Sequence, residues 1–224
     1  AVSGGLLTSG EASERTWETL NAEGIKAYQE GRHVQAIESF RDALSMVANE
    51  KGPDPRQAAI LTNLAAAHEE LENFQEAELR YQQSLTIVES IQGPTHPDLL
   101  PGLKNLANLH RLRDQLAQAE RLYGRSLMIL ERVLGKEHPH LIPSLLDVAR
   151  VCLGQEEYQR SEEYYVRALE IGKAKLSPAH PQTQSIRMQF AALLRHLNRL
   201  DEADALEEQA RHALTSPQQD LTDE

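Results

Sequence analysis

The stretch His96–Gly135, HPDLLPGLKNLANLHRLRDQLAQAERLYGRSLMILERVLG, decides the fold, because most of the chain consists of approximate copies of it. At a period of 42 residues, small side chains recur at Ala77, Ala119, Ser161 and Ala203, and Ala36 comes 41 residues before the first of these. Parallel columns hold aromatic residues (Phe40, Tyr81, Tyr123, Tyr165), leucines (Leu61, Leu103, Leu145) and alanines (Ala65, Ala107, Ala149, Ala191). The one-residue offset falls in a loop, where GPDP at 52–55 is shorter than GPTHP at 93–97, as a structural repeat should show.

The composition is that of a folded, acidic protein. Hydrophobic residues make up 40% of the 224 positions but aromatic residues only 4%, which suits helices packed through Leu and Ala better than a β-sandwich. The formal net charge of −11 disfavours nonspecific binding to nucleic acid or to an anionic membrane surface. Cys152 is the single cysteine, so the sequence excludes an intrachain disulfide and a cysteine-rich metal site.

Helix boundaries follow from capping residues and prolines. Asp54, His96, His138 and His180 each precede a proline, which is well placed as a first helical residue because its missing N–H needs no partner there. We therefore expect each of Pro55, Pro97, Pro139 and Pro181 to begin the first helix of a pair. An earlier helix, capped by Ser13 or Thr16, should run to about Glu30, followed by a turn at 31–32 and a helix over 33–49. Later turns are expected at Asn73, Asp114, Gln155-Glu156 and Asn198.

The apolar spacing predicts helix pairs that stack on their neighbours. Leu61, Leu64, Ala65 and His68 form one stripe of a helix at i, i+3, i+4 and i+7, and the stripe returns one period later. In the second helix of a pair, Ala77 permits a close approach of two helix axes. Tyr81, four residues later, fills the wider gap beside it. Each pair leaves apolar surface that only the next pair can bury.

These columns resemble the tetratricopeptide repeat (TPR), in particular through the Ala-Glu pairs at 77–78 and 119–120 and the aromatic residue four positions after each Ala. The long period, the Asn-Leu-Ala segments at 63–65 and 105–107 and the Gly-x-x-His-Pro loops are similar to the repeats of kinesin light chains. The resemblance implies an all-α, right-handed superhelical solenoid of five antiparallel helix pairs. The expected segments are a flexible leader (1–12), a solenoid (13–214) with repeats at 14–52, 53–94, 95–136, 137–178 and 179–214, and a disordered tail (215–224).

The last repeat departs from the columns. Arg187 takes the place of the first-helix leucine, Glu207 that of the aromatic residue and Arg211 that of a second-helix leucine. A polar terminal repeat is how a solenoid ends in water, so we expect these three side chains to face solvent.

The resemblance also implies a peptide-binding groove lined by the first helix of each pair. The arc about 140° from the packing stripe identifies the candidate residues. They are Asn21, Ile25, Tyr28, Thr62, Asn63, Lys104, Asn105, Asn108, Arg111, Leu146, Asp147, Arg150, Met188, Gln189 and Arg195. Asn63 and Asn105 can donate to and accept from a peptide backbone, and the cations form a basic strip within an acidic protein. Two hypotheses stay open: a groove for an acidic peptide, with apolar contacts from Ile25, Tyr28, Leu146 and Met188, or cations that only pair with Glu69 and Asp147.

One specific version of the groove is disfavoured. The carboxylate-clamp subfamily needs a Lys with an Asn four residues later, which Lys104 and Asn108 supply. It then needs an Asn where this chain has Asp147 and cations where it has Ser185 and Gln189. Capture of a C-terminal carboxylate is therefore not expected.

Catalytic and metal motifs are missing from the sequence. It contains no Gly-rich phosphate loop, no G-x-S-x-G and no HExxH; His68-Glu69 begins the nearest approach, and Glu72 stands at the position of the second His. His96, His138, His140 and His180 lie in or beside successive loops, which are expected roughly 10 Å apart and so too distant to share a zinc ion. Cys152 aligns with His68 and His110 inside the stack, so a buried, inert thiol is expected.

Two functions are compatible with these features, and neither is enzymatic. The first is an adaptor that binds a protein or peptide partner in the groove, without cofactor, metal or nucleic acid. The second is an assembly element whose N-terminal end, with Trp17, Leu20 and Phe40, stacks on another copy to form a homo-oligomer. No run approaches the roughly 20 apolar residues that span a bilayer, so direct membrane insertion is not expected. The protein is expected to be soluble, with the cytoplasm favoured over export after N-terminal processing, which the start at Ala1 leaves open.

Overall fold

The computed structural model describes residues 15–48 and 52–215. Within these ranges it contains ten α-helices and two short 3-10 helices, and no strand. The helices divide between two compact units, one up to Ile91 (unit 1) and one from Gln92 (unit 2). The all-α prediction is confirmed for the described residues, whereas the predicted leader (1–12) and positions 216–224 of the tail lie outside them.

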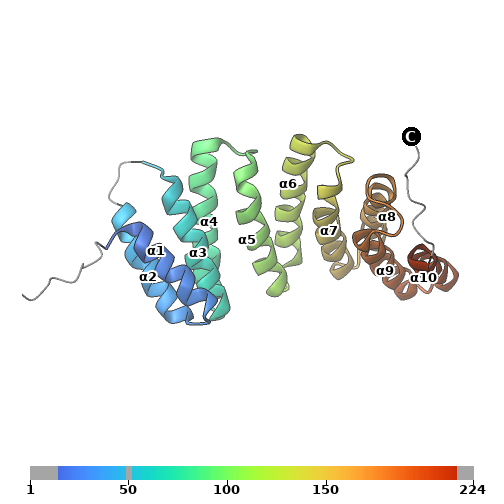
Figure 1. The fold of residues 1–224 in the computed structure, drawn as a ribbon, viewed down its shortest axis with the longest axis horizontal. Helices are drawn as coiled ribbons and strands as arrows, with labels where there is room; N and C mark the ends of the chain where they lie inside the picture. Colours follow the sequence, from blue (N-terminus) through green and yellow to red (C-terminus); the bar gives the residue numbers. More distant parts are fainter. Residues whose placement is uncertain (1–14, 49–51, 216–224) are drawn as a thin grey trace, which may run out of the picture. The chain divides into compact units, whose positions relative to one another are not determined.

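Unit 1 holds α1 (Trp17–Gln29), α2 (His33–Val47), α3 (Pro55–Glu70) and α4, which is Phe74–Gln92 and ends at the border between the units. Unit 2 holds η1 (Pro97–Leu99), α5 (Leu100–Leu112), α6 (Leu116–Leu134), η2 (Pro139–Leu141), α7 (Ile142–Gly154), α8 (Tyr158–Lys175), α9 (Pro181–His196) and α10 (Leu200–Thr215). Consecutive helices run antiparallel within each unit (Figure 1).

Two of the four first helices that were predicted to begin at a proline do so. Pro55 and Pro181 are the first residues of α3 and α9. Pro97 and Pro139 instead begin the 3-10 turns η1 and η2, so α5 and α7 start three residues later than expected. The cause is a second proline four residues on, at positions 101 and 143. It has no N–H to donate to the carbonyl of the first proline, so the α-helical bond cannot form there.

Each turn between paired helices contains one residue in the left-handed region. These residues are Gly31, Glu72, Asp114, Glu156 and Asn198, with φ between 57° and 74°. The amide of the following residue then bonds back to the carbonyl five positions earlier, as in Asn73 N to His68 O at 2.9 Å and Glu157 N to Cys152 O at 2.9 Å. One predicted turn, at Asn73, is therefore centred one residue earlier, on Glu72, whereas Glu156 lies within the predicted turn Gln155-Glu156. The sequence rules for turns do not favour a glutamate at either place.

The repeat columns form the core of both units. In unit 1, Ala36, Phe40, Leu64 and Ala67 belong to one buried cluster, and Gly24 lies against Phe40 so closely that an added Cβ would be 2.5 Å from the ring. In unit 2 the core comprises Ala119, Tyr123, Ala149 and Tyr165 together with their neighbours on α6–α9. The alternation of small and aromatic side chains thus sets how closely the helices approach, as the sequence predicted.

The prediction that Arg187 faces solvent is wrong. Arg187 is only 4% exposed, and its Nη1 donates to the carbonyl oxygen of Pro178 at 2.7 Å. In the two preceding loops the equivalent carbonyls, of Pro94 and Lys136, accept from Arg125 at 2.6 Å and Arg167 at 2.8 Å on the second helix of each pair. In the last repeat the donor to this loop carbonyl is Arg187 on the first helix, α9, and its guanidinium is therefore buried.

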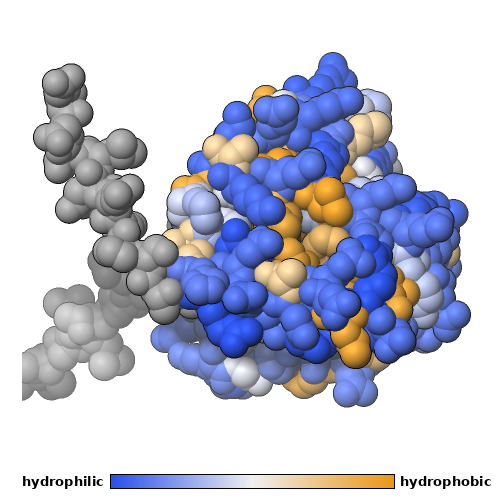
Figure 2. Space-filling view, turned by 90° about the vertical axis from the view of Figure 1, so that its right-hand side faces the viewer, coloured by the Kyte–Doolittle hydropathy of each residue, from blue (hydrophilic) through white to orange (hydrophobic). Residues whose placement is uncertain are grey.

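The remainder of the terminal repeat is largely polar. Figure 2 views the end of unit 2 formed by the last helices, where hydrophobic side chains make a strip within a mostly hydrophilic surface. Arg211 is exposed, in agreement with prediction, whereas Glu207 is partly buried and accepts a hydrogen bond from Arg195.

Candidate functional site on the first helices of the repeats

The predicted site residues fall on the first helices of both units. We call those of α1 and α3 (Asn21, Ile25, Tyr28, Thr62, Asn63) the unit 1 surface. We call those of α5, α7 and α9 (Lys104, Asn105, Asn108, Arg111, Leu146, Asp147, Arg150, Met188, Gln189, Arg195) the unit 2 surface.

The unit 1 surface is tied together by side-chain hydrogen bonds between α1 and α3. Asn63 Nδ2 donates to Asn21 Oδ1 at 3.2 Å, and the Tyr28 hydroxyl donates to Glu70 Oε1 at 3.1 Å. Burial, followed by the charge of Glu70, raises the pKa of Tyr28, so this hydroxyl stays a donor. Ile25 is exposed beside them. The asparagine amides keep further donor and acceptor capacity for a ligand.

Glu69 adds a second carboxylate near this surface. Its Oε2 accepts from the Tyr81 hydroxyl at 3.0 Å, a contact between α3 and α4. Burial raises the pKa of Glu69, and the neighbouring Glu70 raises it further. Within the described part of unit 1, the partner of Glu69 is thus a phenol, and the unit 1 surface is bordered by negative charge.

Thr62 does not belong to this surface in the way predicted. Its Oγ1 donates to the carbonyl of Ala58 at 3.0 Å and lies 2.9 Å from Ser84 Oγ on α4. The hydroxyl is therefore used inside the α3–α4 pair. Helical periodicity placed Thr62 on the arc but could not reveal a serine on the facing helix.

In the unit 2 surface, polar side chains converge on the hydroxyl of Tyr123. This hydroxyl donates to Asn108 Oδ1 of α5. Burial, followed by the Asp147 carboxylate of α7, raises the pKa of Tyr123, while Arg111 and Arg150 act to lower it. Residues from α5, α6 and α7 thus form one polar cluster around a buried tyrosine.

The four cations of the unit 2 surface differ in what they contact. Arg150 pairs with Asp147 and donates to Gln189 Oε1 at 3.3 Å, as the ion-pair hypothesis expected. Arg195 is bound by two carboxylates of α10, Asp204 at 2.7 Å and Glu207 at 3.0 Å. Lys104 and Arg111 are exposed, and among the described residues neither has a carboxylate partner. Only these two offer a full charge to a ligand without first breaking an ion pair.

Two predicted apolar contacts behave differently. Met188 is 51% exposed on α9 and can meet a ligand. Leu146 is only 7% exposed and belongs to the core, so its assignment to the surface is wrong. The reason is that α6 and α8 both pack against α7, and together they cover a wide arc of that helix that includes Leu146.

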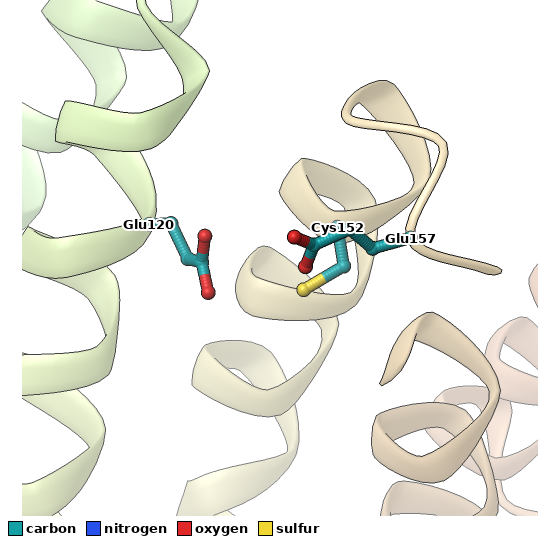
Figure 3. Close-up of side chains that lie close together, drawn as sticks. All are labelled: Glu120, Cys152 and Glu157. Carbon is teal, nitrogen blue, oxygen red and sulfur yellow. The ribbon is translucent and has the colours of Figure 1, made fainter. Parts of the chain in front are cut away.

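Cys152 has neighbours that the sequence did not bring together. The potential ligand atoms of Glu120 on α6, Cys152 on α7 and Glu157, which precedes α8, lie within 4.8 Å of one another (Figure 3). Burial raises the pKa of Cys152 to about 11, so the thiol stays protonated at neutral pH. The expectation of an unreactive thiol agrees with this burial, although it overlooked the two acids.

Those acids already have partners. Arg160 pairs with both Glu120 and Glu157, and Gln155 Nε2 donates to Glu120 Oε2 at 2.8 Å. Burial acts to raise the pKa of Glu120, but the hydrogen bonds from Gln155 and Arg160 outweigh it and lower that pKa. A metal ion would have to displace a guanidinium, so we interpret the group as an ion-pair network that joins α6 to α8.

The loop histidines act as helix caps. The Nδ1 atoms of His96, His138 and His180 each accept a backbone N–H two residues on. His68, by contrast, is buried with both ring nitrogens unpartnered, and His110 Nδ1 lies 2.7 Å from Gln115 Oε1. The sequence predicted caps and packing for these side chains, and the structure confirms both.

The premise for stacking through the N-terminal end is not met. Leu20 and Phe40 are 3% and 1% exposed and belong to the core of unit 1. Trp17 is partly buried, and the Arg56 guanidinium lies 5.7 Å from the centre of its ring.

Comparison with known proteins agrees with the repeat columns. A family model described as Tetratricopeptide repeat matches residues 18–90, 56–132, 98–174 and 145–216. The chain belongs to the tetratricopeptide repeat family. A search of curated proteins gives no significant match.

Solved structures share the fold of this TPR protein. A putative kinesin light chain of Podosopora anserina with nearly identical TPR-like repeats gives a TM-score of 0.78 at 22% identity, covering 90% of this chain and 96% of that one. BtubC (BKLC) from P. vanneervenii gives 0.73 at 18% identity, covering 88% and 78%. The apo form of RapI gives 0.73 at 13% identity, covering 88% and 69%. At these identities the likeness concerns the fold alone.

Proposed function

We propose that this TPR protein is a non-catalytic adaptor whose unit 2 surface binds an extended or helical segment of a partner protein that carries carboxylates. The general role, a protein–protein interaction module, follows from the family, whose members are typically non-catalytic scaffolds. Among the described helices, none is both long and apolar enough to cross a membrane.

The observation that supports the acidic preference is the pair of unneutralised cations on α5. Lys104 and Arg111 are exposed on the same helix as Asn105 and Asn108. Carboxylates of a ligand can pair with the cations while asparagine amides bond its backbone. A hydrogen bond to a charged group contributes about 1.5–3 kcal/mol and a neutral one about 1 kcal/mol, so the cations should dominate selectivity.

Apolar contacts and Arg150 complete the proposed surface. Met188 offers an adaptable, exposed thioether on α9. Arg150 can exchange Gln189 for a ligand oxygen while it keeps Asp147. We leave Leu146 out of the proposal because its side chain belongs to the core, and Arg195 because two carboxylates of α10 hold its guanidinium.

Fluorescence polarisation with a library of labelled peptides rich in Asp and Glu, each paired with a Lys/Arg counterpart, tests the proposal. We expect acidic peptides to bind and K104E/R111E to weaken them at least about tenfold, or roughly 1.4 kcal/mol. R195A is the matched control, since Arg195 is held by α10; it should change affinity less than about twofold. Equal binding of acidic and basic peptides, or an unaffected K104E/R111E variant, would overturn the proposal.

A further inference from the structure

The hydroxyl of Tyr123 contacts two side chains of the unit 2 surface. The Tyr123 ring is buried on α6, with 3% of the residue exposed. Its hydroxyl donates to Asn108 Oδ1 and accepts a hydrogen bond from the Arg111 guanidinium. Asn108 and Arg111 are three residues apart on α5, so their side chains are neighbours on one face of that helix. One hydroxyl of the second helix thus contacts two adjacent positions of the first.

The two contacts together decide which way the Asn108 amide points. A guanidinium carries only donors, so the Tyr123 oxygen is the acceptor in its bond with Arg111. The hydroxyl proton goes to Asn108, which has to present its oxygen to receive it. Among the described residues, this bond to Oδ1 is the one hydrogen bond of the Asn108 side chain. Nδ2 therefore keeps its N–H groups for a ligand.

The exposed part of α5 consequently offers a ligand donors rather than acceptors. Lys104 lies four residues before Asn108, and both Lys104 and Arg111 are exposed. An ammonium and a guanidinium have no acceptor, and the acceptor of the Asn108 amide is already used. The oxygens of a carboxylate only accept, so they can bond all three groups. A side-chain amide would instead bring its own NH2 against these donors.

The other repeats use the same column differently. In unit 1, the Tyr81 hydroxyl donates at 3.0 Å to Glu69 Oε2, and Glu69 occupies the position one period before Arg111. Phe40 fills the column without a hydroxyl and is 1% exposed. Burial raises the pKa of Tyr165 on α8, and among the described residues no hydrogen bond contributes to that shift. The aromatic ring is therefore common to the repeats, whereas the side chains that its hydroxyl holds are not.

We propose that Tyr123 is a positioning residue that makes this part of the unit 2 surface select carboxylate side chains over their amide isosteres. Its hydroxyl holds the Arg111 guanidinium and turns the Asn108 amide so that it can only donate to a ligand. Without the hydroxyl, the amide can rotate by half a turn and offer Oδ1 to a glutamine or asparagine of the ligand. This selection rests on the proposed function, whereas the orientation of Asn108 does not.

NMR spectra of the full chain without ligand test the orientation with the variant Y123F. Phe40 shows that phenylalanine fits the column, so the packing and the ring-current effects on nearby signals should be retained. We expect the side-chain NH2 signals of Asn108 and the Nε–H signal of Arg111 to shift in Y123F. Y165F is the matched control, because it removes a hydroxyl from the same column, and it should leave these signals in place. Unshifted signals in Y123F would overturn the proposal.

The parent chain gives an independent reading of the same orientation, which still decides if Y123F fails to fold. The Nδ2 protons of Asn108 should point away from the Tyr123 hydroxyl. A strong nuclear Overhauser effect between these protons and the Tyr123 ring protons next to the hydroxyl would show the reversed amide and refute the proposal.

Paired peptides test the selection. Fluorescence polarisation compares the tightest acidic peptide of the library with copies in which one Glu or Asp at a time is replaced by Gln or Asn. For at least one position, Y123F should reduce the preference for the carboxylate roughly two- to tenfold, the effect of one hydrogen bond. Y165F should leave the preference unchanged.

The outcomes separate this inference from the proposed function. Shifted Asn108 signals with an unchanged preference in Y123F would overturn the selection and leave the acidic ligand intact. Failure of every acidic peptide to bind would refute the proposed function and the selection with it, while the spectra alone decide whether Tyr123 orients Asn108.

Discussion

The surface of the first helices in unit 1 lies beside the carboxylates Glu69 and Glu70, whereas in unit 2 it carries Lys104 and Arg111. The packing positions of the two units are nearly interchangeable: a small residue and an aromatic one occupy the same columns in both. In this repeat array the buried columns specify the helix pair, whereas the positions between them set the charge of the exposed face.

The largest expected effect concerns how closely helices approach. In G24V, the added side chain meets the Phe40 ring, where even a Cβ would be 2.5 Å away. We expect unit 1 to lose about 3 kcal/mol of unfolding free energy, because the Phe40 ring is 1% exposed and the surrounding core leaves no space into which it can shift. In G154A of unit 2, the Cβ meets only the tip of Leu116 at 2.9 Å, a flexible contact that should cost less than about 1.5 kcal/mol. Urea denaturation of both variants checks this ranking; equal losses would contradict it.

A second, intermediate effect separates two histidines of one column. In H68L, a ring with two buried, unpartnered nitrogens is removed, so we expect no loss or a gain of about 1 kcal/mol. In H110L, the partner of Gln115 is lost, and a cost of about 1–2 kcal/mol is expected. Thermal unfolding at pH 7.5 measures both; a destabilised H68L would show that the ring packs better than leucine does.

His68 should also contribute to the pH dependence of stability. Burial lowers the pKa of His68, so near pH 6.5 the unfolded chain binds more protons at this residue than the folded chain does. The free energy of unfolding therefore decreases as the pH falls below the pKa that His68 has in the unfolded chain. Urea denaturation of H68L and of the parent chain at pH 7.5 and 5.5 isolates this contribution. Between these pH values the variant should lose less unfolding free energy than the parent chain, and an equal loss in both would refute the contribution of His68.

The smallest expected effect is that of Arg195. Its ion pairs with Asp204 and Glu207 are exposed, and water screens such pairs so strongly that they contribute little to stability. R195A should therefore leave the midpoint of thermal unfolding nearly unchanged, and a clear fall in that midpoint would mean that α10 depends on this contact.

The sequence was sufficient for the periodic part of the fold. The columns, the capping residues and the prolines depend on local geometry, and they predicted the helix pairs and all the loop caps. The 3-10 starts at Pro97 and Pro139 could also have been read from the second prolines. The left-handed Glu72 and Glu156 could not, because the turn is imposed by the packing of the two helices it joins.

The site was predicted less completely, because its side chains contact residues that are distant in the sequence. Leu146 is buried because two helices cover α7, and Arg195 is paired because α10 supplies carboxylates from a later stretch of sequence. Arg187 is inside because a loop carbonyl, Pro178 O, needs a donor that the second helix no longer provides. Helical spacing gives the face of a side chain but not the partners that reach it from another helix.

The most direct test of the account is an NMR titration of the full chain with the tightest acidic peptide from the polarisation library. We predict shift changes at the side-chain amides of Asn105 and Asn108 and at the backbone of α5 and α7, which disappear in K104E/R111E, with Asn21 and Asn63 unchanged. Changes that centre on Asn21 and Asn63, or that persist in K104E/R111E, would contradict the assignment of binding to the unit 2 surface.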